Sequence, residues 1–368
     1  MNLETSLATR FAADYRSARA KFLAAAALAG GALKSYANPL KGPEGEELAT
    51  DTAWFGPAEA TKVLVTVSAT HGVEGFCGSG AQIDWLLGPA TAALPPATAL
   101  LFVHAINPHG FAWLRRVTEE GCDLNRNFVD FAKPLPENAG YDELADALVP
   151  PALAGPVFEA AMKRLEDYRA RHGEREFSIA RSGGQYRHPG GTFYGGTAPT
   201  WARRTLAAVI ADHRLAARAL VAVVDYHTGL GPFGYGEPIS GDEPGSPAHR
   251  RSKAWFGPSL TEPTLGTSSS VPKQGMAELE WHRTLGERVS YVALEYGTYP
   301  SNTSGQKALR EDHWLHNYSN VDWPAPETRR IKAQIRRHFY PELPDWQEMV
   351  LFRSRQILRQ ALAGLAQG

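Results

Sequence analysis

The sequence is poor in cysteine, with only Cys77 and Cys122 among its 368 residues. Two cysteines cannot provide the disulfide framework of a small secreted protein. We therefore expect both to be small buried thiols, and a cytoplasmic location is the default expectation.

Long hydrophobic runs are also missing. The longest apolar stretch near the start, Phe22 to Leu33, is too short to span a bilayer. It follows about twenty residues that include several charged side chains, which is atypical of a secretory signal. We expect an amphipathic N-terminal helix there, and no membrane partner.

No charge of one sign dominates. The formal net charge is -1, and no block rich in lysine or arginine stands out. This argues against a nucleic acid or an anionic membrane recognised through bulk charge. Hydrophobic residues make up 43% of the chain, enough for a globular protein with a sizeable core.

Four apolar runs rich in β-branched residues are typical of buried strands: Val63–Ser68, Ala99–Ala105, Leu220–Asp225 and Val289–Leu294. Between and after them, apolar residues recur every three or four positions, which indicates helices. These stretches are Phe158–Arg171, Trp201–Leu220, Glu327–Phe339 and Trp346–Ala363. Alternating strands and helices predict an α/β fold with a central, largely parallel sheet flanked by helices.

Two segments, Ser182–Pro199 and Gly229–Val271, are rich in glycine, proline and serine. We predict long loops there, and loops of that length in a compact domain are usually functional. No internal repeat or linker is visible, so we expect one domain over residues 1–368 with an insertion at about 129–200.

Polar motifs follow each predicted strand. The four strands run into THGVEG (70–75), NPHG (107–110), YHTG (226–229) and EYG (295–297), and DLNRNF (123–128) follows the second motif. In open α/β sheets, ligands bind beyond the carboxyl ends of the strands. These motifs should therefore meet at one edge of the sheet.

Two histidines and one carboxylate, His71, Glu74 and His227, are the ligand set expected of a catalytic zinc with a fourth position left open. Glu295 would supply the general base that such a site needs. Each fragment alone is weak, but their combination predicts a metal-dependent enzyme that needs no organic cofactor.

Taken together, HGVE, NPHG, the Arg115–Arg116 pair, DLNRNF, DYHTG and LEYG resemble the motifs of the zinc carboxypeptidases of the carboxypeptidase A type. The chain is most similar to a bacterial branch of poorly defined substrate, with the aspartoacylase-like deacylases as relatives. The resemblance covers Val63 to Phe128 and Val221 to Gly297. It implies the three-layer α/β fold of that superfamily, also called phosphorylase/hydrolase-like, with a mixed, largely parallel sheet.

The resemblance also assigns roles to single residues. It implies one Zn²⁺ per chain held by His71, Glu74 and His227, with Glu295 as the base. Asp123 resembles the carboxylate that orients a ligand histidine, here His71.

Five further residues are candidates for a substrate site. Asn125 and Arg126 resemble the pair that grips a terminal carboxylate, a task suited to a planar guanidinium. Arg116 resembles the arginine that stabilises the oxyanion, although Arg115 could hold that role instead. No secure match to the substrate-capping tyrosine exists; Tyr235 is the candidate because it lies between His227 and Glu295.

The chain departs from the family in ways that leave the substrate open. NPHG, with His109, stands where the family usually has NPDG, and the arginine pair lies closer to DLNR than in digestive carboxypeptidases. A peptide with a free carboxylate and a small N-acyl amino acid are both expected substrates. A non-catalytic binding protein is a third reading, but loss of catalysis would usually remove Glu295 or a metal ligand.

Overall fold

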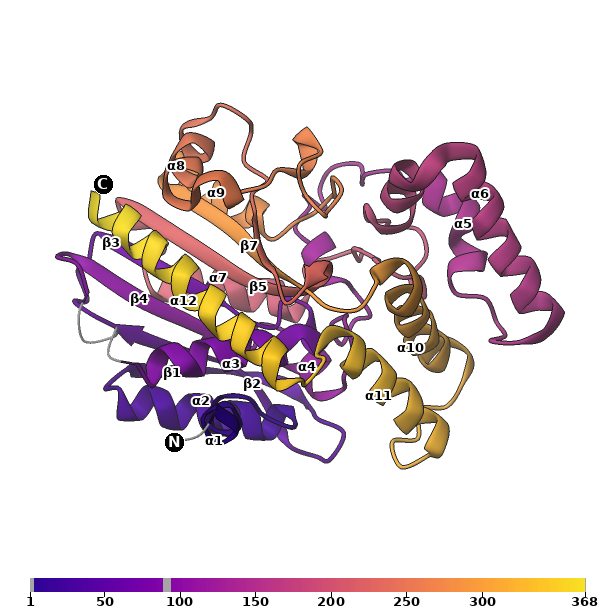
Figure 1. The fold of residues 1–368 in the computed structure, drawn as a ribbon, viewed down its shortest axis with the longest axis horizontal. Coiled ribbons are helices and arrows are strands. Elements are labelled where there is room, and N and C mark those ends of the chain that lie inside the picture. Colours follow the sequence, from indigo (N-terminus) through magenta and orange to yellow (C-terminus); the bar gives the residue numbers. More distant parts are fainter. Residues whose placement is uncertain (1–2, 89–93, 368) are drawn as a thin grey trace.

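The fold is built on one seven-stranded sheet with the strand order β1-β2-β4-β3-β5-β7-β6 (Figure 1). The computed structural model describes residues 3–88 and 94–367. The strands are β1 (Ala32–Lys41), β2 (Glu47–Phe55), β3 (Lys62–Val67), β4 (Thr98–His104), β5 (Leu220–Phe233), β6 (Gly236–Ile239) and β7 (Val289–Gly297). The sheet is mixed, because β1, β2 and β6 pair antiparallel with their neighbours.

The four central strands, β4, β3, β5 and β7, are mutually parallel. They are the four strands predicted from apolar runs, and every residue of β4 and β7 is buried. The α/β class with a largely parallel sheet is therefore confirmed.

Helices cover both faces of the sheet and give it three layers. On one face, Leu64 and Val224 pack with residues of α2, α3 and α12, which lies across the front of the sheet in Figure 1. On the other face, Val65 and Val223 pack with residues of α7 and α9. Successive strand residues thus serve opposite cores, which is why the central strands are apolar at every position.

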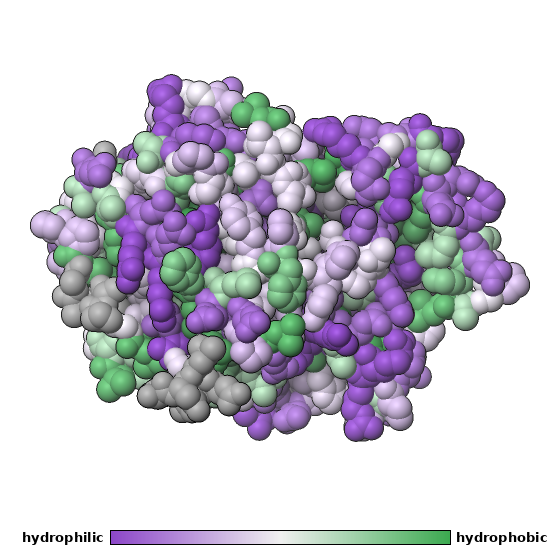
Figure 2. Space-filling view, in the orientation of Figure 1, coloured by the Kyte–Doolittle hydropathy of each residue, from purple (hydrophilic) through white to green (hydrophobic). Residues whose placement is uncertain are grey.

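The helices of the structure are α1 (Leu3–Arg10), α2 (Tyr15–Leu28), α3 (Gly75–Leu86), α4 (Pro108–Ala112), α5 (Ala139–Leu148), α6 (Gly155–Ser182), α7 (Trp201–Asp212), α8 (Pro247–Phe256), α9 (Glu278–Leu285), α10 (Gln306–Tyr318), α11 (Pro326–Phe339) and α12 (Pro344–Gln367). The four helices predicted from periodicity correspond to α6, α7, α11 and α12. None of the helices in the described ranges is long and apolar enough to cross a membrane. On the face drawn in Figure 2, hydrophobic residues appear only in small, separate groups.

Several predicted boundaries are wrong. The N-terminal helix ends at Leu28 rather than Leu33, and residues 32 and 33 begin β1. Helix α7 ends at Asp212, before β5. The predicted loop over Gly229–Val271 contains the end of β5, strand β6 and helix α8.

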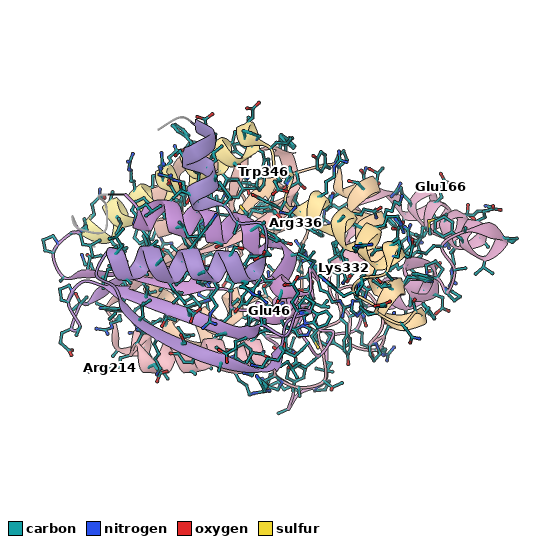
Figure 3. All side chains as sticks on the ribbon, turned by 90° about the horizontal axis from the view of Figure 1, so that it is seen from below. Glu46, Glu166, Arg214, Lys332, Arg336 and Trp346 are labelled. Carbon is teal, nitrogen blue, oxygen red and sulfur yellow. The ribbon has the colours of Figure 1, made fainter. Side chains whose placement is uncertain are left out.

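The segment at about 129–200 forms helices α5 and α6, which lie beyond the end of the sheet, to the right in Figure 1. These helices share a small hydrophobic cluster of their own that includes Tyr141, Leu144 and Phe177. Figure 3 shows how far the segment projects: Glu166 of α6 and Arg214, which follows α7, lie at opposite ends of the molecule. The last turn of α6 returns to the sheet edge and lines a cavity there.

Candidate functional site

The carboxyl ends of the parallel strands open into a cavity of about 330 Å³. Its lining includes His71, Glu74, His227 and Glu295. The structure therefore brings motifs from three strands to one place, as their positions after the strands predicted.

Two short turns hold the first motif in place. Ala69, after β3, and Ala105, after β4, both have a φ of 61°, a left-handed conformation uncommon for alanine. The turns bond to one another, because the amide of Asn107 donates to the carbonyl oxygen of Ala69 at 3.2 Å. Gly72 is required here, since a Cβ on it would lie 2.1 Å from the backbone of Gly110.

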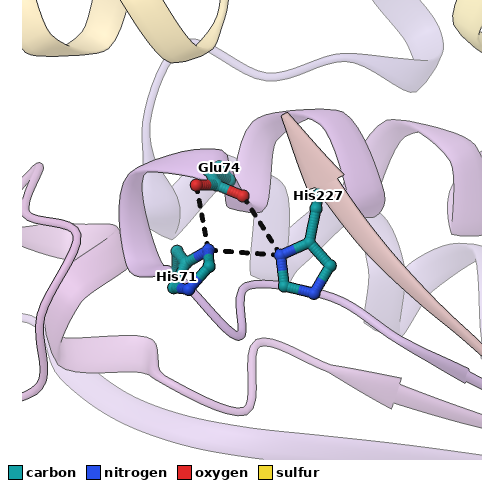
Figure 4. Close-up of side chains that lie close together, drawn as sticks. All are labelled: His71, Glu74 and His227. Atoms are coloured by element: carbon teal, nitrogen blue, oxygen red, sulfur yellow. Dashed lines mark hydrogen bonds and ion pairs between the residues drawn. The ribbon is translucent and has the colours of Figure 1, made fainter. Parts of the chain in front are cut away.

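His71, Glu74 and His227 are buried and point toward one another (Figure 4). His71 Nδ1 lies 3.0 Å from Glu74 Oε1 and 3.2 Å from His227 Nδ1, and His227 Nδ1 lies 3.4 Å from Glu74 Oε2. An ion in tetrahedral coordination with bonds of about 2.0–2.1 Å holds its ligand atoms about 3.3 Å apart. These residues can therefore hold a metal ion.

Each histidine has a carboxylate behind it. His71 Nε2 lies 3.2 Å from Asp123 Oδ1, and His227 Nε2 lies 3.1 Å from Asp225 Oδ2. Asp225 is fixed in turn, because the Thr70 hydroxyl donates to it at 2.9 Å and the Tyr291 hydroxyl at 2.8 Å. Such carboxylates set the tautomer and ring orientation of metal-binding histidines. Asp123 lies where it was predicted, whereas the role of Asp225 was missed although it belongs to the DYHTG motif.

The adjacent arginines point in different directions. Their carbonyl oxygens accept the amides of Gly72 and Val73, which fixes the backbone at this point. The Arg116 guanidinium faces the cavity and donates to Asp123 and Glu74 at 2.9 Å each. Arg115 instead donates to Asp312 of α10 at 3.1 Å and does not line the cavity.

Glu295 lies beside His227, because the two residues are partners in the register of β5 and β7. Its Oε1 accepts the amide of Leu230 at 3.1 Å. Burial and the negative charge of Glu74 raise the pKa of Glu295 to about 7. A carboxylate with a pKa near neutrality is suited to accept and return a proton.

Carboxylates surround the two imidazoles. Glu74, Asp123 and Asp225 lie within 3.4 Å of a ring nitrogen of His71 or His227. Burial alone would lower the pKa of His227, but Asp225 and Glu74 reverse the effect and raise it to about 10. The site therefore favours an added positive charge, as a cation-binding site should.

Asn125 and Arg126 both line the cavity, but neither side chain is free. Asn125 Oδ1 accepts the amide of Ala277 at 2.7 Å. The Arg126 guanidinium is buried, and its Nε and Nη2 donate to the carbonyl oxygen of Ser182 at 3.3 and 2.7 Å. Its Nη1 donates to the carbonyl oxygen of Asn125 at 2.6 Å and to Met276 Sδ at 3.7 Å. These contacts hold Arg126 in place, and one N–H group on Nη2 remains for a ligand.

Tyr235 does not reach the cavity, which corrects its prediction as a substrate-binding residue. It lies in the tight turn between β5 and β6, where its side chain is 44% exposed. The Arg353 guanidinium packs 5.6 Å from its ring centre. The prediction was wrong because the segment after His227 continues as a strand instead of forming a flexible loop.

Two cavity residues carry no sequence motif and were missed. Arg181 lies in the last turn of α6, and Lys273 lies in the segment that leads to α9. Both come from segments for which only loops or an insertion were predicted. The only indication in the sequence is the presence of a basic residue beside glycine, serine or proline residues.

A second group of metal-ligand types consists of Asp242, Glu278 and His282, of which Glu278 and His282 line the cavity. His282 Nε2 is 2.9 Å from Asp242 Oδ1 and 3.8 Å from Glu278 Oε1. Burial alone would lower the pKa of His282, but the two carboxylates raise it to about 10. This group has one imidazole, whereas the His71 group has two imidazoles with a carboxylate behind each, so the His71 group is the better metal site.

Several solved structures are similar to this chain. An aspartoacylase family protein from Mesorhizobium loti is 15% identical with a TM-score of 0.38, over 77% of this chain and 66% of that chain. A metallo-carboxypeptidase from Burkholderia cenocepacia is 13% identical with a TM-score of 0.40, over 86% of this chain and 66% of that chain. Murein-tripeptide amidase MpaA from Escherichia coli O157 is 17% identical with a TM-score of 0.32, over 79% of this chain and 93% of that chain.

A carboxypeptidase and an aspartoacylase family protein are thus both among the structures similar to this chain. The chain spans just under two thirds of the length of each of these two proteins. No curated protein matches the sequence. One family model matches residues 11–353, and the chain accordingly belongs to the DUF2817 family, described as proteins of unknown function.

Proposed function

We propose that the chain is a zinc-dependent hydrolase that cleaves an amide bond next to a free carboxylate. One ion per chain would be held by His71, Glu74 and His227. The observation that carries the proposal is the triangle of ligand atoms at 3.0–3.4 Å, with a carboxylate behind each imidazole. Imidazole and carboxylate ligands with one position left open are typical of catalytic zinc sites.

When bound, the ion would polarise the substrate carbonyl and make a nearby water more acidic. The protein supplies the remaining chemistry. Glu295 takes the proton of the attacking water and returns it to the nitrogen of the leaving amine. Its position beside His227 places this carboxylate at the same end of the cavity as the metal ligands.

Arg116 would stabilise the negative charge that develops on the carbonyl oxygen. Arg116 Nη2 lies 2.7 Å from His71 Nε2. An ion on Nδ1 would leave the proton on Nε2, which then donates to Asp123. We therefore expect Arg116 to turn from His71 toward the open cavity when the metal binds.

Asn125 and Arg126 are proposed to bind the free carboxylate. The cavity of about 330 Å³ lies near the lower end of the range for small-molecule sites. That size suits a dipeptide or a small N-acyl amino acid better than a long peptide. Both a carboxypeptidase and a deacylase of N-acyl amino acids therefore remain candidate activities on the same chemistry.

The test is a panel of C-terminal dipeptides and N-acyl amino acids, each as the acid and as its carboxamide, assayed with and without a chelator. We expect hydrolysis of acids only, its loss on chelation and its recovery with zinc. Hydrolysis that survives complete metal removal would contradict the metal-dependent mechanism. Equal rates on acids and carboxamides would contradict recognition of the free carboxylate.

A further inference from the structure

Three basic side chains line the cavity without an acidic partner: Arg126, Arg181 and Lys273, here called the cationic wall. In the described part of the chain, none of the three forms an ion pair with a carboxylate. Arg116, in the same cavity, is paired with both Glu74 and Asp123. The wall is therefore exceptional within its own site.

Hydrogen bonds to backbone carbonyl groups connect the segments that carry the three cations, and we call these bonds the backbone seam. The Arg126 guanidinium donates to the carbonyl oxygen of Ser182, and the amide of Gln274 donates to the carbonyl oxygen of Gly183 at 2.8 Å. Arg181 and Lys273 each precede a residue of this seam, so their backbones run side by side. The seam joins the end of α6 to the segment before α9, close to the sheet edge.

The donors of the wall are only partly used. Lys273 Nζ donates to the Ser270 hydroxyl and lies 3.4 Å from the carbonyl oxygen of Val271. Arg181 Nε is buried and has no acceptor among the described residues. The Arg181 guanidinium lies 5.8 Å from the ring centre of Phe177, a contact that leaves its N–H groups available.

Burying cationic side chains without anionic partners is unfavourable, and this cost lowers the pKa values of the side chains in the wall. Burial and the charge of Arg126 lower the pKa of Lys273 to about 7. Burial likewise lowers the pKa of Arg181 to about 10. A bound anion would relieve both effects, which makes these groups natural partners for a charged ligand.

We propose that Arg181 and Lys273 bind a second acidic group of the substrate, so that the preferred substrates are amides with two carboxylates. This inference rests on the proposed function, in which Asn125 and Arg126 hold the first carboxylate. Arg181 and Lys273 line the cavity, and neither forms an ion pair with a described carboxylate. Their N–H groups would therefore donate to a second carboxylate of the substrate.

The second carboxylate could lie on either side of the scissile amide. An amino acid with an acidic side chain, as in N-acetyl-glutamate, places it on the amine side. A dicarboxylic acyl group, as in N-succinyl-glycine, places it on the acyl side. Each of these diacids has a monoacid partner of nearly the same shape, in which a carboxamide replaces the second carboxylate. The partners are N-acetyl-glutamine and N-succinamyl-glycine.

The experiment measures the affinities of these four compounds by calorimetry on the zinc-loaded, full-length Glu295→Gln protein, in which turnover is suppressed. We expect at least one diacid to bind at least about tenfold more tightly than its monoacid partner. The pair that shows the preference identifies the side of the amide. Equal affinities within both pairs would overturn the proposal without any variant of the wall.

Variants then locate the subsite. Arg181→Gln and Lys273→Met, each in the Glu295→Gln background, should reduce the preference about fivefold or more, and the double change should abolish it. Arg175→Gln is the matched control, because Arg175 is an exposed arginine of the same helix. A preference that survives in a folded double variant would assign the second carboxylate elsewhere and overturn the proposal.

The two hypotheses fail in different ways. Binding preference without hydrolysis of any compound by the wild-type, zinc-loaded chain would contradict the proposed function and support the anion subsite. Hydrolysis of both members of each pair with equal kcat/KM, together with equal affinities, would support the proposed function and overturn the subsite.

Discussion

The two ends of the cavity treat charge in opposite ways. At the metal end, His71, His227 and Arg116 each contact a carboxylate, and the outer carboxylate Asp225 is held by two hydroxyl groups. At the cationic wall, no described carboxylate pairs with Arg181 or Lys273. Groups that the chain itself satisfies have fixed positions, whereas groups left unsatisfied are available to a ligand. We therefore expect changes at the metal end to affect metal binding and catalysis, and changes at the wall to affect substrate binding.

The largest effect is expected at the metal end, from Glu295→Gln. The change keeps the size of the side chain and removes its basicity, so kcat should fall about 10²–10⁴-fold. Metal content should stay at the wild-type level, because Glu295 is not among the proposed ligands. Glu237→Gln is a matched control, since Glu237 pairs with Glu295 across β6 and β7 but does not line the cavity. A Glu295→Gln protein with more than half of the wild-type kcat would place the base elsewhere.

The next effect concerns the outer carboxylates. Asp225→Asn and Asp123→Asn should each weaken zinc affinity about 10–100-fold, because the histidines lose the partners that orient them. Competition with a chromogenic chelator would measure this. Asp212→Asn, a change at a partly exposed carboxylate of α7 that pairs with Lys34, should have no effect. Unchanged affinity in both cavity variants would mean that these carboxylates do not support metal ligands.

The sequence predicted the metal end better than the wall for a physical reason. The strands β3, β4, β5 and β7 are buried on both faces, so unbroken apolar runs reveal them, and motifs at their ends converge by topology. The edge strand β1 is exposed along most of its length, and no such run marks it. The segments that carry Arg181 and Lys273 are joined by a backbone hydrogen bond between residues far apart in the sequence, which no local pattern encodes.

Proton release upon metal binding should show the raised pKa of His227. The pKa of His227 is raised to about 10, so the imidazole is protonated at neutral pH in the metal-free protein. Binding a metal at Nδ1 requires the neutral ring, and about one proton should leave at pH 7. The apparent zinc affinity should therefore rise roughly tenfold per pH unit between pH 6 and 9. Calorimetry in buffers of different ionisation enthalpy measures the released proton, and the absence of release would contradict a His227 ligand.

The smallest effect on catalysis is expected from Arg115→Ala, at the arginine that points away from the cavity. This change removes a buried ion pair with Asp312, which keeps Lys332 as its second partner. Unfolding free energy should fall by about 1.5–3 kcal/mol, while kcat stays within about twofold. Arg116→Ala should strongly reduce kcat, and it should also lower the unfolding free energy, because Glu74 and Asp123 lose their shared partner. Denaturant titration and steady-state kinetics on both variants would separate the two roles, and a catalytic loss confined to Arg115→Ala would exchange them.

The most direct test of the account is a crystal structure of the zinc-loaded protein with anomalous data collected on both sides of the zinc edge. We predict one strong peak per chain, about 2.0–2.2 Å from the Nδ1 atoms of His71 and His227 and from Glu74. A peak at Asp242, Glu278 and His282 in its place, or no zinc peak in catalytically active protein, would contradict the central claim.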